Sequence, residues 1–161
     1  MTFADLLAWA DIVTLHVPLL PDTRNLISEN ELAKMKPGAV LIEASRGGIV
    51  DEAALAACLT AGRIHGAAVD VYDTEPPGSD SPLLMLKGEA AQRLLLTPHI
   101  ADVTRQASAQ LFRAAWQNVE RVLLRNEPPH HRVFLKKNRC QFVLTFARST
   151  TALQRSTSRS S

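Results

Sequence analysis

The stretch AVLIEASRGGIVDEAALAACLTAGRIHGAAVDV, residues 39–71, decides the fold class of this chain. Two short apolar segments within it, residues 39–43 and 66–71, have the composition of buried β-strands. Between them, Asp51 is placed to cap a helix that Gly62 ends. A strand, a helix and a second strand in this order predict a βαβ unit, in which the two strands run parallel.

The same alternation extends to both sides of this unit. Residues 12–17 and 94–97 indicate two further strands, the first of them stopped by Pro18. Further helices are expected over residues 3–10, from the Ser28/Glu31 capping box to about residue 36, and from Thr104 to about residue 125. Because the strands are nearly continuous apolar runs, we expect an α/β fold with a doubly wound parallel sheet, in three layers α/β/α.

Length and composition narrow the class of protein. The chain has 161 residues, enough for one domain, and its apolar fraction of 46% is ordinary for a globular protein. No apolar run is long enough for a membrane span, and the acidic start does not resemble a secretory signal. Two scattered cysteines, Cys58 and Cys140, give neither a disulfide framework nor the spacing of a metal site, which fits a reducing cytoplasm.

The C-terminal tail, residues 135–161, differs in composition from the rest. It has six Lys and Arg and no Asp or Glu, so it carries +6 while the net charge of the chain is only +2. It is also rich in Ser and Thr, and we expect an unrelated, disordered extension. A nucleic-acid-binding arm is the alternative, but cations spread without interleaved aromatic residues are a generic signal that argues against it.

Residue types that carry chemistry follow three of the expected strands. Arg46 comes after the strand at 39–43, Asp70 and Glu75 come at or after the end of the next strand, and His99 follows the strand at 94–97. Ligands of doubly wound sheets bind beyond the carboxyl ends of the strands. These side chains are therefore expected to converge at one edge of the sheet.

The three residue types suit the reduction of a keto acid. An Arg guanidinium forks onto a carboxylate, a His exchanges a proton near neutral pH, and a neighbouring Glu fixes the imidazole and favours its charged form. The hydride would have to come from a cofactor. Each residue alone has a structural alternative: a strand-end His is more often structural, Arg46 could belong to a turn and Glu75 to a surface loop. Their joint placement favours a site.

Four segments carry a resemblance to a known family. They are ADIVTLHVPLLPDTRNLI (10–27), MKPGAVLIEASRGGIVDEAAL (35–55), GRIHGAAVDVYDTEP (62–76) and LLLTPHIA (94–101). In this order they resemble the NAD-binding domain of the D-isomer-specific 2-hydroxyacid dehydrogenases, which include phosphoglycerate dehydrogenases, hydroxypyruvate/glyoxylate reductases and D-lactate dehydrogenases. Residues 118–134 resemble the closing segment of that domain more loosely, so residues 1–134 form the expected domain.

The resemblance implies a role for each matching residue. Arg46 matches the substrate-binding catalytic arginine, Glu75 the glutamate that supports the acid/base, and His99 the catalytic histidine. The implied cofactor is NAD, with NADP not excluded, and the implied substrate is a small 2-hydroxy or 2-keto acid. The residues implied to line the cofactor are Thr14, His16 and Pro18 at the adenosine end, Ala44, Ser45 and Arg46 along the nicotinamide side, Asp70 beside the carboxamide, and His99.

The chain departs from the family pattern in three ways. Glu43 stands where an Asn close to the cofactor is usual, and Asp102 stands where a Gly is usual after the histidine. The dinucleotide fingerprint G-x-G-x-x-G does not occur. We therefore expect the second half of a Rossmann-type NAD-binding domain, truncated and weakly active or inactive alone.

The alternative to an enzyme is a non-catalytic interaction fragment that pairs with a complementary half or with a full-length homologue. The family is commonly dimeric through this domain, so a homo-oligomer or a complementary chain is an expected partner. A Rossmann sheet that starts at this strand also leaves a strand edge free to pair with another chain. The identity of the substrate is not readable from these residues.

Overall fold

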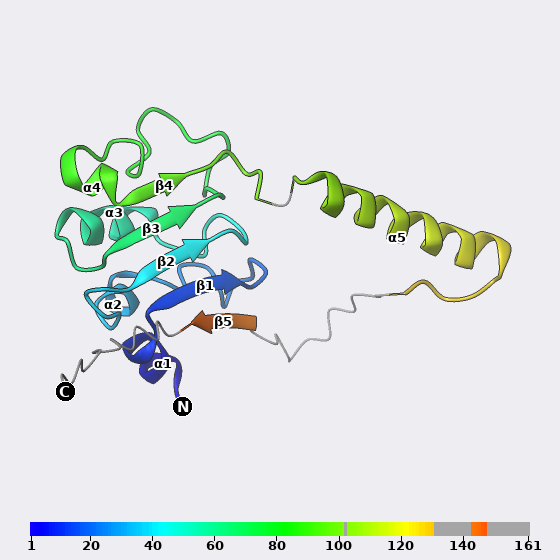
Figure 1. The fold of residues 1–161 in the computed structure, drawn as a ribbon, viewed down its shortest axis with the longest axis horizontal. Coiled ribbons are helices and arrows are strands. Elements are labelled where there is room, and N and C mark those ends of the chain that lie inside the picture. Colours follow the sequence, from blue (N-terminus) through cyan, green and yellow to red (C-terminus); the bar gives the residue numbers. More distant parts are fainter. Residues whose placement is uncertain (102, 131–142, 148–161) are drawn as a thin grey trace, which may run out of the picture.

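The structure, a computed structural model, describes residues 1–101 and 103–130 and the backbone of residues 143–147. Its elements alternate between helix and strand along the chain (Figure 1), which confirms the α/β class. They are α1 (Phe3–Trp9), β1 (Ile12–His16), α2 (Glu29–Leu32), β2 (Val40–Glu43), α3 (Glu52–Thr60), β3 (Gly66–Val69), α4 (Gly88–Gln92), β4 (Leu94–Leu96), α5 (Arg105–Leu124) and β5 (Val143–Ala147).

The sheet has the strand order β4-β3-β2-β1-β5. Strands β1 to β4 are parallel, as expected from their apolar runs, with Ile12 opposite Val40 and Val40 opposite Gly66. Strand β5 pairs antiparallel with β1, with Ile12 opposite Ala147. The edge of β1 that we expected to be free is therefore covered by the same chain.

Strand β5 lies within the tail for which we expected disorder, so over these five residues the structure differs from that expectation. Its sequence, Val-Leu-Thr-Phe-Ala, is rich in residues that favour strands, and β1 offers it an edge with unpaired backbone groups. Residues 131–142 and 148–161, and Asp102, lie outside the described residues.

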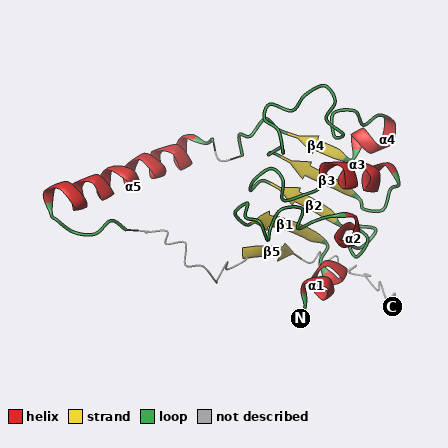
Figure 2. Cartoon of the chain, turned by 180° about the vertical axis from the view of Figure 1, so that it is seen from behind, coloured by secondary structure: helices red, strands yellow, loops and turns green. Residues whose placement is uncertain are grey.

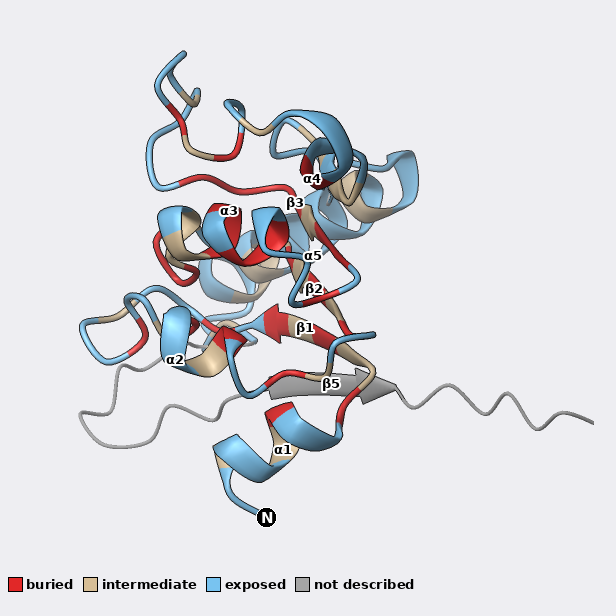
Figure 3. Cartoon of the chain, turned by 90° about the vertical axis from the view of Figure 1, so that its left-hand side faces the viewer, coloured by how far each residue is buried: buried red, intermediate tan, exposed pale blue. Residues whose placement is uncertain are grey.

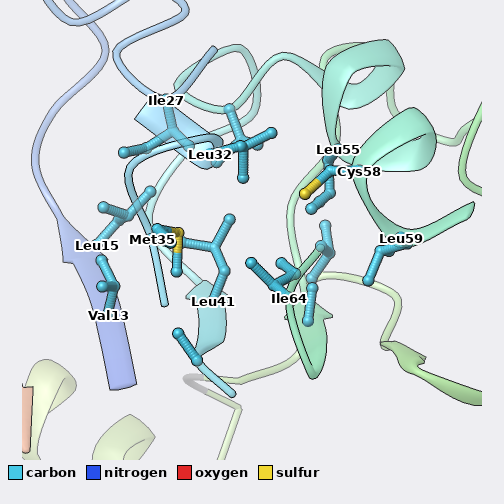
Figure 4. Packing of buried hydrophobic residues seen from close by; sticks show 14 of the residues in the cluster. Val13, Leu15, Ile27, Leu32, Met35, Leu41, Leu55, Cys58, Leu59 and Ile64 are labelled. Carbon is cyan, nitrogen blue, oxygen red and sulfur yellow. The ribbon is translucent and has the colours of Figure 1, made fainter. Parts of the chain in front are cut away.

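The hydrophobic core lies between the sheet and the helices α2 and α3, which cover one face of it (Figure 2). Figure 4 shows the packing of the buried side chains that the strands and helices contribute, among them Val13, Leu15, Ile27, Leu32, Leu41, Leu55 and Leu59. On the opposite face of the sheet the side chains are covered far less: Ile42 is half-buried and Leu95 is 63% exposed. The continuous apolar runs led us to expect burial on both faces.

The helix starts follow the expected capping. Ser28 and Glu31 form their capping box, and the side chains of Asp51 and Thr104 accept hydrogen bonds from the amides three residues on. Helix α2 ends at Leu32, earlier than expected, and α4 was not expected.

Helix α5 projects away from the rest of the molecule (Figure 1), and none of its residues is buried (Figure 3). Within the described residues, no helix combines the length and the apolar character that crossing a membrane requires.

Candidate functional site

Asp70, directly after β3, organises the segment that follows β4. Its Oδ1 accepts hydrogen bonds from the Thr97 hydroxyl and from the Ile100 amide at 2.9 Å, and its Oδ2 accepts one from the Ala101 amide, also at 2.9 Å. Burial acts to raise the pKa of Asp70, but these hydrogen bonds outweigh burial and hold the pKa below its ordinary value. An ionised Asp70 thus fixes the backbone of the two residues that follow His99.

His99 lies in this fixed segment and contacts Glu75. Its Nδ1 is 2.7 Å from Oε2 of Glu75, 24 positions away in the sequence. The side chains of both residues remain accessible, at 42% and 37% exposure. The φ of His99 is 54°, in the left-handed region that non-glycine residues seldom adopt, and such conformations are often found at functional sites.

Tyr72 holds Glu75, the second member of this pair, in place. Its backbone amide donates to Oε1 of Glu75 at 3.0 Å, and its buried hydroxyl donates to the Thr97 carbonyl at 2.8 Å. Each Glu75 oxygen therefore has a partner, one in the backbone and one in the His99 ring. Tyr72 links the segments after β3 and β4, which sets the distance between Glu75 and His99.

Arg46 is presented by a tight turn after β2. Gly47, the next residue, lies so close to the backbone of Tyr72 that a Cβ there would be 1.7 Å from the Tyr72 carbonyl oxygen. The turn also rests on Glu43, whose Oε1 accepts hydrogen bonds from the Ser45 amide, the Ser45 hydroxyl and the Arg46 amide. This packing brings the Arg46 turn against the segment that carries Glu75.

Glu43 itself is 2% exposed, and burial raises the pKa of its carboxyl, against the opposing effect of the Ser45 and Arg46 hydrogen bonds. Its Oε2 is buried and has no hydrogen-bond partner among the described residues. The resemblance implies that this position lies close to the cofactor. In the structure the side chain lies under the turn and supports the backbone of Ser45 and Arg46.

The electrostatics of the pair favour an imidazolium beside a carboxylate. The hydrogen bond with Glu75 raises the pKa of His99 above its ordinary value, and the negative charges of Glu75 and Asp70 act in the same direction. The charge of Arg46 is close enough to oppose this and lower the pKa of His99 in part. The bond to His99 is in turn the main cause that lowers the pKa of Glu75. The arrangement thus favours the protonated form of His99.

The remaining residues expected at the site lie on β1 or directly after β1 and β2. Thr14 and His16 form a pair of their own on β1, with Thr14 Oγ1 3.0 Å from His16 Nε2. Pro18 follows β1, and Ala44 and Ser45 follow β2 beside the Arg46 turn. Sequence reasoning missed the parts played by Tyr72 and Thr97, because an aromatic residue after a strand and a Thr before a Pro give no signal of a shared partner.

The residues fit one part of a nicotinamide cofactor better than another. Polar and charged side chains with accessible atoms, His99 and Arg46, lie beyond the ends of β4 and β2 at the edge where such sheets bind ligands. A glycine turn at a helix N-terminus, which holds a pyrophosphate through backbone amides, is absent from the sequence. The nicotinamide end of a dinucleotide therefore fits this edge, and its phosphates have no such cradle here.

Comparison with known proteins identifies a family and several relatives. Residues 1–101 match the profile of the D-isomer specific 2-hydroxyacid dehydrogenase, NAD binding domain. The chain is 48% identical over 105 residues to a D-3-phosphoglycerate dehydrogenase of Archaeoglobus fulgidus, covering 65% of this chain and 19% of that protein. It is 48% identical over 120 residues to an (S)-sulfolactate dehydrogenase of Chromohalobacter salexigens, covering 74% of this chain and 37% of that protein.

The fold matches as well. A D-isomer specific 2-hydroxyacid dehydrogenase from Xanthobacter autotrophicus Py2, solved in complex with NADPH and MES, superposes with a TM-score of 0.69 at 34% identity, over 83% of this chain and 41% of that one. The chain thus spans less than half the length of each of these three proteins.

Proposed function

Because the chain belongs to the D-isomer-specific 2-hydroxyacid dehydrogenase family, in its NAD-binding domain, we propose that it serves the interconversion of a 2-keto acid and a D-2-hydroxy acid with NAD or NADP. The observation that carries the proposal is the 2.7 Å contact between His99 and Glu75 beside Arg46. A bound nicotinamide would supply the hydride.

His99 is the proposed general acid in the direction of reduction. Its raised pKa favours the protonated imidazole, which can give a proton to the oxygen of a keto acid as that oxygen gains negative charge. Glu75 binds Nδ1, which leaves Nε2 to face the substrate. Because the Tyr72 amide holds Glu75, the imidazole is kept in one orientation.

Arg46 is the proposed anchor for the substrate carboxylate. Its Nη1 donates to the Ser45 carbonyl at 2.6 Å, which steadies the guanidinium at the turn. A guanidinium binds a carboxylate through two parallel hydrogen bonds, a geometry that Lys does not reproduce. With the carboxylate held there, the keto oxygen of a 2-keto acid lies one carbon away and is within reach of a neighbouring proton donor.

The chain alone is expected to turn over slowly or not at all. Much of the affinity for a dinucleotide comes from the pyrophosphate, and this sequence has no glycine-rich turn to bind it. Titration of the purified chain with NADH should give a dissociation constant above the micromolar range. Tighter binding would mean that another part of the chain holds the phosphates.

Grafting tests the proposal. Residues 3–134 replace the matching segment in a full-length relative, such as the sulfolactate dehydrogenase, and the graft is assayed for NADH-dependent reduction of the 2-keto acid that corresponds to that enzyme's hydroxy-acid substrate. His99→Ala should lower turnover by roughly 10²–10⁴, as expected for loss of a general acid. The control is His65→Ala, at an exposed histidine just before β3 and away from the site. If His99→Ala stays near full activity in an active graft, His99 is not the acid.

A further inference from the structure

Glu43, the last residue of β2, places a carboxyl group on the core side of the sheet. Side chains along β2 alternate between half-buried and buried, and Glu43 shares the buried side with Leu41, which packs in the core (Figure 4). Burying a carboxylate costs free energy unless the charge is paired or hydrogen-bonded. The partners of this carboxyl therefore indicate what it does.

The two oxygens of Glu43 have unequal surroundings. Oε1 accepts three hydrogen bonds, from the Ser45 amide at 2.7 Å, from the Ser45 hydroxyl at 2.6 Å and from the Arg46 amide at 3.3 Å. Oε2 is buried and has no partner among the described residues. Because three donors already occupy Oε1, a proton that binds to Glu43 binds at Oε2.

The other groups around this carboxyl do little to favour its charge. Glu43 lines a cavity of about 10 Å³, whose remaining walls are mostly apolar: Gly47, Gly48, Val50, Leu55, Val69, Val71 and Leu83. The ionisable residue that α3 contributes to this cavity is Glu52, which is a like charge. Asp70, at the end of the neighbouring strand, bonds to the segment after β4 instead. The guanidinium of Arg46 is exposed and bonds to the Ser45 carbonyl.

We propose that Glu43 is a positioning residue for Arg46, and that a proton bound at its Oε2 loosens the turn that presents this arginine. This inference rests on the proposed function, in which Arg46 anchors the substrate carboxylate. A carboxylate accepts charge-assisted hydrogen bonds, which are roughly twice as strong as those between neutral groups. Once Oε2 takes up a proton from solvent, Oε1 is a neutral carbonyl oxygen, and all three bonds to the turn weaken together.

The weakened bonds act on Arg46 directly. Two of the three end on the backbone amides of Ser45 and Arg46, so they set the direction of the chain where the guanidinium is attached. Gly47 still packs against the Tyr72 backbone, which keeps the turn in its place. Proton binding therefore changes the alignment of the guanidinium and leaves the fold intact. Two parallel hydrogen bonds to a carboxylate depend on that alignment.

A falling pH should therefore weaken the binding of a keto acid. The ionised form of Glu43, which holds the turn, is present above the pKa of Glu43 and is lost as pH falls through it. Burial raises this pKa, so the transition lies above the ordinary value of a glutamate. His99 acts in the opposite direction, since a falling pH supplies the proton that the proposed acid needs. The two groups can thus be told apart.

The first measurement uses the full chain without cofactor or substrate, so its outcome does not depend on the proposed function. NMR follows the side-chain carboxyl carbon of Glu43 and the amide protons of Ser45 and Arg46 as pH is varied. All three signals should report the same transition, above the ordinary pKa of a glutamate. In Glu43→Gln the two amides should lose it. Glu52→Gln, the matched control in the same cavity, should keep it.

Ser45→Ala provides a second variant that leaves the buried carboxyl in place. It removes the hydroxyl bond to Oε1 and keeps both amide bonds. Because the hydroxyl bond lowers the pKa of Glu43, its loss should move the NMR transition to higher pH. Ser79→Ala, at an exposed position, is the control and should leave the transition where it is. Circular dichroism checks that each variant is folded.

The second measurement separates binding from turnover in the graft of residues 3–134. With the unchanged segment, KM for the keto acid should rise as pH falls through the transition that NMR locates. In Glu43→Gln, KM should be higher by about fivefold at neutral pH, which corresponds to the loss of one ordinary hydrogen bond, and should stay level over the same transition.

Two results would overturn the inference. One is a pair of Ser45 and Arg46 amides that do not follow the titration of the Glu43 carboxyl, because the turn would then not depend on the proton. The other is a Glu43→Gln graft whose KM equals that of the unchanged graft at every pH. An Arg46→Ala graft with an unaltered KM would instead contradict the proposed function, while the coupling between Glu43 and the turn, measured in the chain alone, would stand.

Discussion

Nδ1 of His99 lies 2.7 Å from Oε2 of Glu75, and this contact joins the segments that follow β4 and β3. The carboxylate is fixed from behind by the Tyr72 amide, and the histidine backbone is fixed by Asp70. The side chains of Glu75 and His99 are thus accessible and titratable, while hydrogen bonds from Tyr72 and to Asp70 hold them in position.

Glu75→Gln should lower the pKa of His99 toward its ordinary value. The hydrogen bond with the Glu75 carboxylate is the main cause that raises this pKa, and an amide keeps a hydrogen bond but removes the charge. The measurement is an NMR titration of the His99 ring in the full chain. Glu29→Gln, at an exposed position, is the control and should leave the titration unchanged. An unchanged His99 pKa in Glu75→Gln would show that the contact is not formed in solution.

Gly47→Ala should destabilise the fold by about 1–3 kcal/mol, the cost of forcing extra atoms into packed structure. A Cβ at this position would lie 1.7 Å from the carbonyl oxygen of Tyr72, so the turn or the strand end has to move. Urea denaturation measures the difference in the free energy of unfolding. Gly38→Ala is the matched control, since a Cβ there meets nothing within 4 Å. Equal stability of the two variants would contradict the close approach.

Asp70→Asn should loosen the segment around His99. An amide cannot accept hydrogen bonds at both of its terminal atoms, so one of the bonds from the Ile100 and Ala101 amides is lost. Hydrogen exchange should show faster exchange at these two amides. Asp73→Asn, which changes only an exposed ion pair with Arg24 and its surroundings, should leave their exchange as in the wild type. Protection that survives in Asp70→Asn would mean that other contacts hold the segment.

Much of this arrangement could be predicted from the sequence. The strands at β1, β2 and β3, the caps Asp51 and Thr104, and the convergence of Glu75 and His99 follow from local patterns and from the rule that strand ends share an edge. Strands and caps depend on residues that are neighbours in the sequence, so a single sequence contains the information. The shared edge follows from the right-handed connections of parallel strands, which hold for the whole fold class.

Other features depend on distant partners. Helix α4 contains Gly88 and is too short to show periodicity, and the pairing of β5 with β1 joins segments more than a hundred residues apart. The apolar residues Leu111, Ala115, Val119 and Val122 recur at helical spacing, but this periodicity shows which side of a helix is apolar and does not show what covers it. The burial of Glu43 was also hidden, because its partners Ser45 and Arg46 are adjacent in the sequence and look like part of the site.

Arg46→Ala, in the graft of residues 3–134, should raise the Michaelis constant and lower turnover together, with a combined loss of about 10²-fold or more in kcat/KM. The reason is that the guanidinium both binds and orients the carboxylate in the proposed mechanism. Arg46→Lys should recover only part of the loss, because an ammonium group cannot form two parallel hydrogen bonds to a carboxylate. Arg24→Ala is the control, since Arg24 forms an exposed ion pair with Asp73. A change in turnover alone, with the Michaelis constant unaltered, would contradict anchoring.

The pH dependence of kcat/KM for keto-acid reduction by the graft tests the central claim most directly. If the imidazolium of His99 is the proton donor, the rate is highest below the raised pKa of His99 and falls as pH rises through it. Glu75→Gln lowers that pKa, so the fall should begin at a lower pH. A profile that rises over this range, or one that Glu75→Gln leaves in place, would contradict the account.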